Sequence, residues 1–317
     1  MTYSIIAEGL VKRFGDTVAL DGIDLAVRTG SVFGLLGPNG AGKTTAVRIL
    51  ATLMRPDGGR AAVCGHDVVG HAHQVRQLTG LTGQYASVDE TLTGLENLML
   101  IGRLTGQSRP AARARARELL AGFRLDDAGD RAVKTYSGGM RRRLDLAASL
   151  VTRPRVLYLD EPTTGLDPLS RNEMWDVVRG LAAGGVTVLL TTQYLEEADH
   201  LAGEIAVIDH GTVIATGTPD ELKARTGALT LSVRPAHPAD VPAVAAVMAG
   251  FSHADPEVRN TTVTVPVGGE DVMPAVVGRL REAGMRVAEL TLRGSSLDEV
   301  FLSLTGHRTN AEGSAAA

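Results

Sequence analysis

Short apolar runs alternate with longer amphipathic stretches over the first two thirds of the chain. Such runs are typical of strands buried on both faces, and the clearest are 32–36, 156–159, 186–191 and 205–208. Helical patterns separate the later runs, at 171–181 and 194–201. This alternation predicts an α/β fold with a mostly parallel sheet, whose ligand binds beyond the carboxyl ends of the strands. Further short strands are expected at 4–7, 18–27, 61–65 and 78–83.

The pattern changes twice along the chain. Residues 88–150 are mostly helical, and strict alternation of apolar and polar residues resumes after residue 226, together with short amphipathic helices. We therefore expect a first domain at 1–225 with a helical subdomain at about 88–150. A small α+β domain is expected at 226–308, and a flexible tail at 309–317 because its residues are small and polar.

A glycine-rich loop follows the first buried strand and opens a helix. It fits G-x-x-x-x-G-K-[ST], and its members are Gly37, Pro38, Asn39, Gly40, Ala41, Gly42, Lys43, Thr44 and Thr45. Glycines let the backbone wrap closely around an anion, and the helix N-terminus adds N–H donors. This context predicts a P-loop that binds ATP, with Lys43 at the β- and γ-phosphates and the Thr44 hydroxyl on Mg²⁺.

An acidic pair, Asp160 and Glu161, follows the buried strand 156–159. In a parallel sheet this position faces the phosphate-binding loop. Asp160 suits Mg²⁺, directly or through water, and Glu161 suits a general base for the attacking water.

Two weaker signals lie elsewhere. Ser137 can cap the helix that follows it, and Gly138 and Gly139 would bare its N-terminal amides as a second anion site, although an ordinary capped helix with a basic surface fits equally. Phe14 precedes a turn, where its ring either stacks on an adenine or packs in the core.

Composition narrows the class of protein. Of 317 residues, 44% are apolar and 21% charged, and the net charge of −4 gives no general attraction to nucleic acid. The single cysteine allows no intrachain disulfide, in agreement with a reducing cytosol. No secretion signal is visible, and no apolar run approaches the roughly 20 residues that span a bilayer, so membrane work would need a separate partner.

Taken together, these motifs resemble the nucleotide-binding subunit of an ATP-binding cassette (ABC) transporter. The resemblance covers residues up to about 225 and rests on the motifs in family order: the loop 37–45, Gln84, 137–139, 157–162 and 165–167. The closer similarity is to exporter ATPases of the daunorubicin/doxorubicin-resistance type. It is carried by the phrases at 83–90, 136–145, 191–194 and 296–301.

The resemblance implies a mechanism. Two subunits would pair head to tail, with each ATP between the loop 37–45 of one and Ser137, Gly138 and Gly139 of the other. Asp167 would lie at the subunit seam, and Gln84 would contact Mg²⁺ and the attacking water. Phe14 would sit where the family stacks an aromatic ring on adenine.

Two departures from the family pattern stand out. The signature usually begins with Leu and ends with Gln, where this chain has Tyr136 and Met140. Gln193 occupies the place of a histidine that contacts the γ-phosphate; glutamine can donate a hydrogen bond but cannot carry a charge near neutral pH. The drug-resistance type is similar in having Gln here, so we expect a working ATPase of undetermined turnover rate.

We therefore expect an ATP-hydrolysing subunit, cytoplasmic and peripheral on the inner face of the membrane. It would power export of a drug or natural product through a separate permease of the ABC-2 type. The alternatives are a soluble ABC ATPase acting on ribosomes or nucleic acid, and an ATP-binding regulatory module. The single phosphate-binding loop and the acidic net charge disfavour the first, and Lys43 with Glu161 disfavours the second.

Overall fold

The computed structural model describes residues 2–83, 88–225, 229–252, 254–269, 271–294, 296–297 and 300–301. Its contacts divide the chain into two compact units, 1–219 and 220–308, and each is described by itself. The domain boundary expected after residue 225 stays a prediction.

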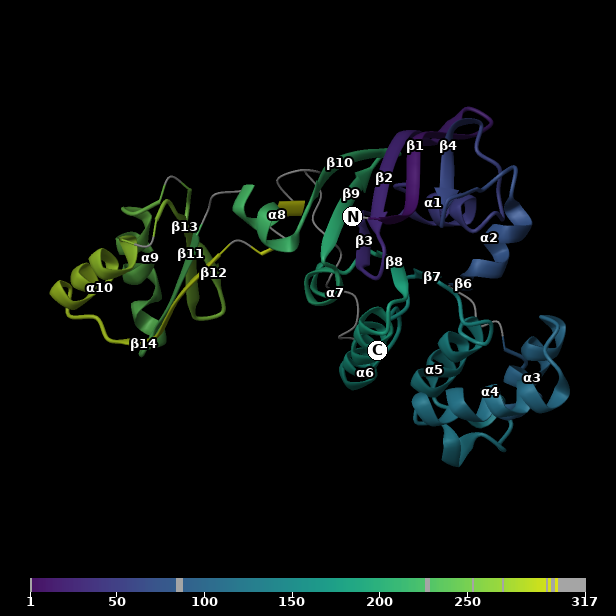
Figure 1. Ribbon diagram of the computed structural model, residues 1–317. Helices are drawn as coiled ribbons and strands as arrows, with labels where there is room; N and C mark the ends of the chain where they lie inside the picture. The colour runs from purple at the N-terminus through teal and green to yellow at the C-terminus, as the bar shows by residue number, and fades with distance from the viewer. Residues whose placement is uncertain are drawn as a thin grey trace. The chain divides into compact units, whose positions relative to one another are not determined.

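A six-stranded sheet forms the centre of the first unit (Figure 1). Its order is β10 (Thr212–Gly217), β9 (Glu204–Asp209), β3 (Val32–Leu36), β8 (Thr187–Thr192), β7 (Val156–Asp160) and β6 (Thr79–Thr82). All neighbours are parallel except β9 and β10. Every residue of β3, β7 and β8 is buried, which explains their uninterrupted apolar runs. The predicted α/β fold with a mostly parallel sheet is confirmed.

The register brings the carboxyl ends of the central strands to one edge. Leu36 of β3 pairs with Thr192 of β8, and Asp160 of β7 pairs with Thr191. The three segments that follow these strands therefore start side by side, although the segment after β3 is more than a hundred residues from the other two in sequence.

A second, antiparallel sheet packs on the same core. Its order is β2 (Thr17–Arg28), β1 (Tyr3–Phe14), β4 (Gly58–Val63) and β5 (His66–Asp67). Apolar side chains of β1 and β2 join those of β3, β7 and α1 (Lys43–Leu50) in one cluster. The short helix α2 (Ala72–Leu78) was not expected from the sequence. It ends where a strand was expected to start, and that strand, β6, begins at Thr79.

Helices gather in a lobe of their own, drawn in teal in Figure 1. It contains α3 (Gly94–Leu104), α4 (Arg109–Gly122), the 3₁₀ turns η1 (Asp126–Ala128) and η2 (Val133–Thr135), and α5 (Gly138–Ser149). Thr93, Ser108 and Ser137 each cap the helix that follows by accepting a backbone N–H. The mostly helical character expected for 88–150 is confirmed.

Two further helices, α6 (Pro168–Ala183) and α7 (Leu195–Leu201), complete the first unit. The helix α8 (Pro219–Arg225) begins at the residue where the first unit ends in the sequence. Within the ranges given above, no helix combines the length and apolarity needed to cross a bilayer.

The second unit is the expected small α+β structure. Its antiparallel sheet has the order β12 (Glu257–Arg259), β13 (Thr262–Val267), β11 (Leu229–Pro235) and β14 (Val287–Gly294). The turn η3 (Pro238–Asp240) leads into α9 (Val241–Ala249), and α10 (Val272–Glu282) follows β13. Apolar residues of both helices and of β11 and β13 form one core. Of the helix expected at 297–304, the described residues are Leu297, Val300 and Phe301, all helical and buried.

Candidate active site

The phosphate-binding loop runs from the end of β3 to the start of α1, as the motif predicts. A Cβ on Gly37 would lie 2.3 Å from the Ile208 carbonyl oxygen, and one on Gly42 would lie 2.5 Å from that of Ala19. Gly42 also has φ 109°, in the left-handed region that favours glycine. The loop is therefore wedged between β9 and β2, and only glycine fits at these two points.

Lys43 lies over this loop and is 5% exposed. Its Nζ donates to the carbonyl oxygens of Gly37 at 2.8 Å and Pro38 at 3.0 Å. Burial lowers the pKa of Lys43, and the nearby carboxylates of Glu161 and Asp160 oppose that shift. The structure thus holds a buried cation at the mouth of a glycine cradle, where a phosphate group could replace the carbonyls as its partner.

Asp160 ends β7 and joins two hydroxyl groups. Its Oδ1 accepts from Thr191 Oγ1 at 2.5 Å and from Thr44 Oγ1 at 3.2 Å. The two residues expected to hold Mg²⁺ therefore lie together, although 116 positions separate them. Among the described residues no group of three or more His, Cys, Asp or Glu side chains is placed to hold a metal ion.

Glu161 occupies a turn with an unusual backbone. Its φ is 50°, and its N–H donates to both the carbonyl oxygen and the hydroxyl of Thr191, at 3.1 and 3.2 Å. Its Oε1 lies 3.8 Å from Lys43 Nζ, and its Oε2 accepts from Thr164 Oγ1 at 3.4 Å. The carboxylate is therefore aimed at the phosphate-binding loop by contacts on both oxygens.

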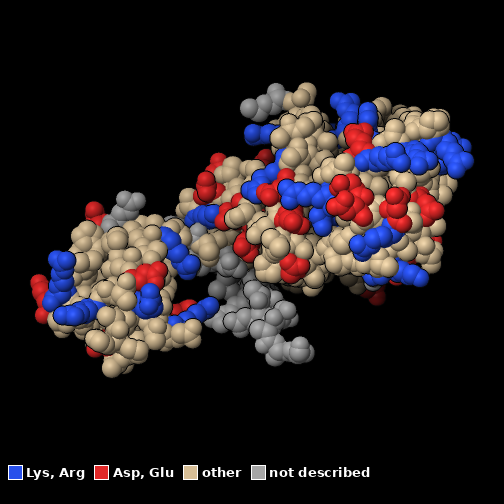
Figure 2. Space-filling model, turned by 90° about the horizontal axis from the view of Figure 1, so that it is seen from below, with Lys and Arg blue, Asp and Glu red and all other residues tan. Residues whose placement is uncertain are grey.

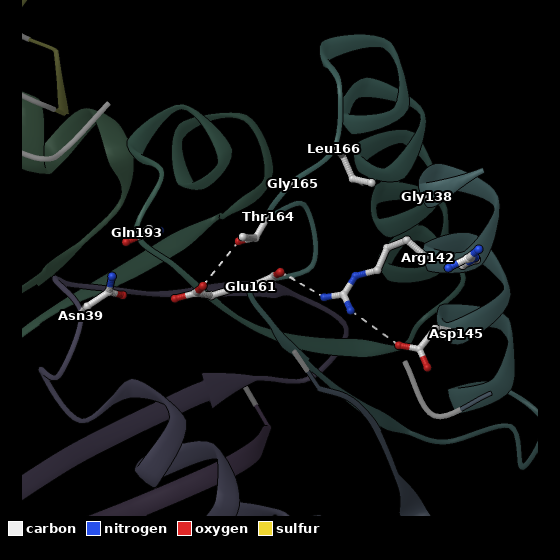
Figure 3. Close-up of a pocket in the computed structure, with 10 residues that line it drawn as sticks. Asn39, Gly138, Arg142, Asp145, Glu161, Thr164, Gly165, Leu166 and Gln193 are labelled. Carbon is white, nitrogen blue, oxygen red and sulfur yellow. Dashed lines mark hydrogen bonds and ion pairs between the residues drawn. The ribbon is translucent and has the colours of Figure 1, made fainter. Parts of the chain in front are cut away.

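Two hollows meet at Glu161. The smaller, about 180 Å³, is lined by the glycine loop, Lys43, Thr44 and Thr45, with Ala19 of β2. The larger, about 670 Å³, extends from Asn39, Glu161 and Gln193 to Gly138 and Leu166 (Figure 3). Gln193 follows β8 directly and lines the larger hollow together with Asn39 and Glu161, so it shares the space in front of Glu161.

The segment 137–139 and Asp167 lie at the starts of two neighbouring helices. Ser137 caps α5 by accepting from Met140 N at 3.2 Å, and Asp167 caps α6 by accepting from Ser170 N at 2.9 Å. The Ser170 hydroxyl, which donates to Asp167 Oδ2 at 2.7 Å, and the Ser170 N–H hold the pKa of Asp167 below its usual range. A Cβ on Gly139 would lie 2.7 Å from Ser170 Oγ, so a larger residue at this position would have to displace the Ser170 side chain. Ser137, Gly138 and Asp167 are exposed.

The remaining expected residues lie apart from the cradle or outside the described chain. Phe14 is 48% exposed at the end of β1, with Lys12 Nζ 5.6 Å from its ring centroid, and it lines neither hollow. Packing of Phe14 in the core, one of its two interpretations, is therefore wrong, and stacking on adenine stays a prediction. Gln84 lies outside the described residues.

Sequence reasoning missed two residues of the site. Thr191 was counted only as a strand residue, yet its hydroxyl and carbonyl hold Asp160 and Glu161. Arg142 was counted as part of a basic helix surface, yet its side chain is 13% exposed and binds the turn that carries Glu161. The pairing of Arg142 with Asp145 at i,i+3 was the available signal.

The arrangement joins an anion cradle, a buried cation, a hydroxyl–carboxylate pair and an aimed carboxylate. These are the parts that phosphoryl transfer to water requires. Over the face seen in Figure 2, basic and acidic side chains lie among one another within each unit, without a broad basic surface.

Comparison with known proteins agrees with this geometry. The family model described as ABC transporter matches residues 20–164. The chain is 57% identical to the daunorubicin resistance ATP-binding protein DrrA2 of Streptomyces coeruleorubidus, covering 97% of this chain and 96% of that protein. It is 54% identical to the daunorubicin/doxorubicin resistance ATP-binding protein DrrA of Streptomyces peucetius, over 96% of this chain and 93% of that protein.

More distant relatives and solved structures are of the same kind. A Nod factor export ATP-binding protein I of Ralstonia nicotianae is 41% identical over 94% of this chain and 92% of that protein. An ATP-binding cassette of an ABC transporter in its ADP conformation has a TM-score of 0.63 at 26% identity, covering 70% of this chain and 93% of that structure. These relatives are resistance and export proteins, and they favour an exporter over an ATPase acting on ribosomes or nucleic acid. ATP-binding subunits of such exporters work with a separate membrane permease. The chain belongs to the ABC transporter family, as an ATP-binding and ATP-hydrolysing subunit of the exporter type.

Proposed function

We propose that this subunit hydrolyses ATP to drive export of a drug or related natural product through a permease of the ABC-2 type. The observation that carries the catalytic part is the meeting of Lys43, Asp160 and Glu161 at one glycine cradle. The cargo rests on the daunorubicin-resistance relatives, which match nearly the whole chain at 54–57% identity.

Mg²⁺ fits the oxygen atoms at the end of β7. The Thr44 hydroxyl and the Asp160 carboxylate are 3.2 Å apart, and hydroxyl and carboxylate oxygens are the ligands that Mg²⁺ prefers. These two residues, with Gln84 from outside the described range, would hold the ion, which when bound neutralises charge on the phosphate oxygens. Thr191 keeps the carboxylate in place through its 2.5 Å hydrogen bond.

Each residue of the cradle then has its own task. Backbone N–H groups of the loop 37–45, which every residue there except Pro38 carries, bind the phosphates, and Lys43 pairs with their charge. Glu161 accepts a proton from the attacking water, and Gln193 donates a hydrogen bond to the γ-phosphate across the shared hollow. Phe14 stacks on the adenine.

We infer that the site is completed by a second copy of the chain, paired head to tail. Ser137, Gly138 and Asp167 are exposed at helix starts, so their polar groups are accessible to a partner. In this arrangement Ser137, Gly138 and Gly139 of one copy face the nucleotide of the other, and Asp167 lies at the seam. The pair sits on the cytoplasmic face of the membrane and contacts it through the permease.

ATP-dependent uptake of doxorubicin into inverted membrane vesicles tests this function, because the drug is fluorescent. Vesicles from cells that express the chain with its permease are expected to accumulate the drug when ATP is added. Vesicles with Glu161→Gln are expected to lose uptake while the chain still binds ATP, since glutamine keeps the shape but accepts no proton. Intact ATP hydrolysis without uptake would contradict the cargo, and uptake that survives Glu161→Gln would contradict the assignment of the base.

A further inference from the structure

Arg142 reaches from α5 of the helical lobe into the turn that carries Glu161. Its Nε donates to the Pro162 carbonyl oxygen at 2.7 Å, and its Nη2 donates to those of Glu161 at 3.0 Å and Asp160 at 3.4 Å. Its Nη1 donates to the Gly83 carbonyl oxygen at 2.8 Å. One guanidinium group therefore holds three consecutive carbonyls of the turn and the end of the segment after β6.

The charge of Arg142 is balanced where it is buried. Its Nη1 lies 3.6 Å from Asp145 Oδ2, one helical turn further along α5, and Asp145 is 2% exposed (Figure 3). Burial lowers the pKa of Arg142, and the carboxylates of Asp145, Glu197 and Asp160 oppose the shift. Arginine keeps its charge under such conditions, and its planar fork can serve several acceptors at once.

The turn depends on outside support because of its backbone. Glu161 has φ 50°, a left-handed conformation that is unfavourable for a non-glycine residue. Hydrogen bonds to Thr191 fix the N–H of Glu161, and Arg142 fixes its carbonyl oxygen and those on either side. The direction of the Glu161 carboxylate follows from this backbone.

We propose that Arg142 is the positioning residue of the catalytic turn: it sets the place of the Glu161 carboxylate and ties that place to the helical lobe. The proposal rests on the function proposed above, in which Glu161 is the base. A displacement of α5 would move Arg142 and with it the carbonyls of residues 160–162. The Gly83 carbonyl oxygen, which accepts from the same guanidinium group, would move with them.

A plain structural role, in which Arg142 only fastens α5 to the sheet, makes a different prediction. The neighbouring residue Arg143 provides the matched control. It lies on the same helix, its side chain is 18% exposed, and it binds the Phe123 carbonyl oxygen at 3.3 Å and Glu173 at 3.6 Å. Within the described part of the chain it makes no hydrogen bond or ion pair with the turn. Loss of either arginine removes a largely buried guanidinium group from α5, but only Arg142 touches the turn of Glu161.

The test compares steady-state ATP hydrolysis, ATP affinity by calorimetry and Tm for the full chain and its variants. Arg142→Ala is expected to lower kcat by about 10- to 100-fold, because small misplacements of a catalytic group have effects of this size, while the Kd for ATP changes by less than about 3-fold. Arg142→Lys, which keeps the charge but not the fork, should fall between the wild type and Arg142→Ala. Arg143→Ala should keep kcat within about 2-fold, because the contacts that support the turn do not involve Arg143.

A double variant separates positioning from bracing. If Arg142 acts through Glu161, then adding Arg142→Ala to Glu161→Gln should lower the residual kcat by less than about 2-fold, because the group it positions is already lost. Multiplied losses in the double variant, or equal losses in Arg142→Ala and Arg143→Ala, would overturn the proposal. If Arg142→Ala does not fold, the same comparison is made with Arg142→Lys.

The two layers of proposal fail in different ways. An unchanged kcat in Arg142→Ala, with Glu161→Gln inactive, would overturn the role of Arg142 alone. Normal hydrolysis in Glu161→Gln would overturn the assignment of the base, and the positioning role would fall with it.

Discussion

Lys43 is the residue on which we expect phosphate binding to depend most directly. It is buried, and its ammonium group lies against two loop carbonyls and 3.8 Å from Glu161. Lys43→Ala is expected to weaken ATP binding by roughly 1.5–3 kcal/mol, the loss of one charged hydrogen-bonding contact, and to lower hydrolysis as well. Calorimetric titration with ATP measures the first effect. An unchanged Kd would remove Lys43 from the site.

Gln193 is expected to act in ATP hydrolysis rather than in ATP binding. Because it shares the hollow in front of Glu161, its effect should be largest when charge redistributes on the γ-phosphate. We expect Gln193→Ala to lower kcat by about 10- to 100-fold with little change in ATP affinity, and Gln193→His to keep part of the activity. Single-turnover hydrolysis is the measurement, and a normal rate in Gln193→Ala would refute the contact.

The candidate site residues could be predicted from the sequence because they belong to short contiguous motifs. Lys43 and Thr44 belong to one loop, and Asp160 and Glu161 follow one strand. Arg142 and Glu197 escaped prediction because their partners are distant: Arg142 binds carbonyls 18–20 positions away, and Glu197 binds Thr163 at a separation of 34. A basic helix surface and an acidic helix start have the same local pattern whether the side chain turns inward or outward.

Some strands and helices could also be predicted from the sequence, and others could not. Strands buried on both faces, such as β3 and β7, were predictable because nothing polar interrupts them. The helix α2 was not, because its sequence AHQVRQL places only Val75 in the core and carries no periodic signal. Its boundary with β6 is set by pairing with β7, which is a tertiary contact.

The helix α7 carries a buried glutamate, Glu197, whose ionisation should affect the stability of the fold. Glu197 is fully buried, and its Oε1 accepts from Thr163 Oγ1 at 2.8 Å and Trp175 Nε1 at 3.3 Å. Burial raises the pKa of Glu197 above its ordinary value, although hydrogen bonds from Thr192, Thr163 and Trp175 oppose the shift. The folded state therefore binds the proton more tightly than the unfolded chain does.

The sign of the pH dependence follows. The contribution of Glu197 to stability is present in full below the ordinary pKa of a glutamate and is lost as pH rises through the raised pKa of the folded state. Glu197→Gln cannot ionise, so its free energy of unfolding should gain on the wild type as pH rises through this window. Urea unfolding at a series of pH values measures the difference. The exposed neighbour Glu196→Gln is the control, and equal behaviour of the two variants would contradict the assignment.

At the scale of the whole molecule, the second unit has its own core and none of the cradle residues. We expect it to serve assembly with a second copy or with the permease, although Leu297, Val300 and Phe301 could equally just pack the final helix. A chain that ends at Arg225 should bind ATP with unchanged affinity, because the cradle lies wholly in the first unit.

The same shortened chain should lose dimer stability or export. Native mass measurement, co-purification of the permease and drug uptake are the readouts. Survival of all three would show that the assembly role is wrong, and loss of ATP binding in a folded chain would show that the second unit helps to build the nucleotide site.

The left-handed backbone of Glu161 also bears on how this protein can change under selection. A glycine at that position would relax the turn and is expected to raise Tm by a few degrees, while removing the base and with it ATP turnover. The same substitution is therefore expected to increase stability and to abolish activity. A library screened for heat resistance alone should accumulate Glu161→Gly, and one screened for drug resistance should purge it.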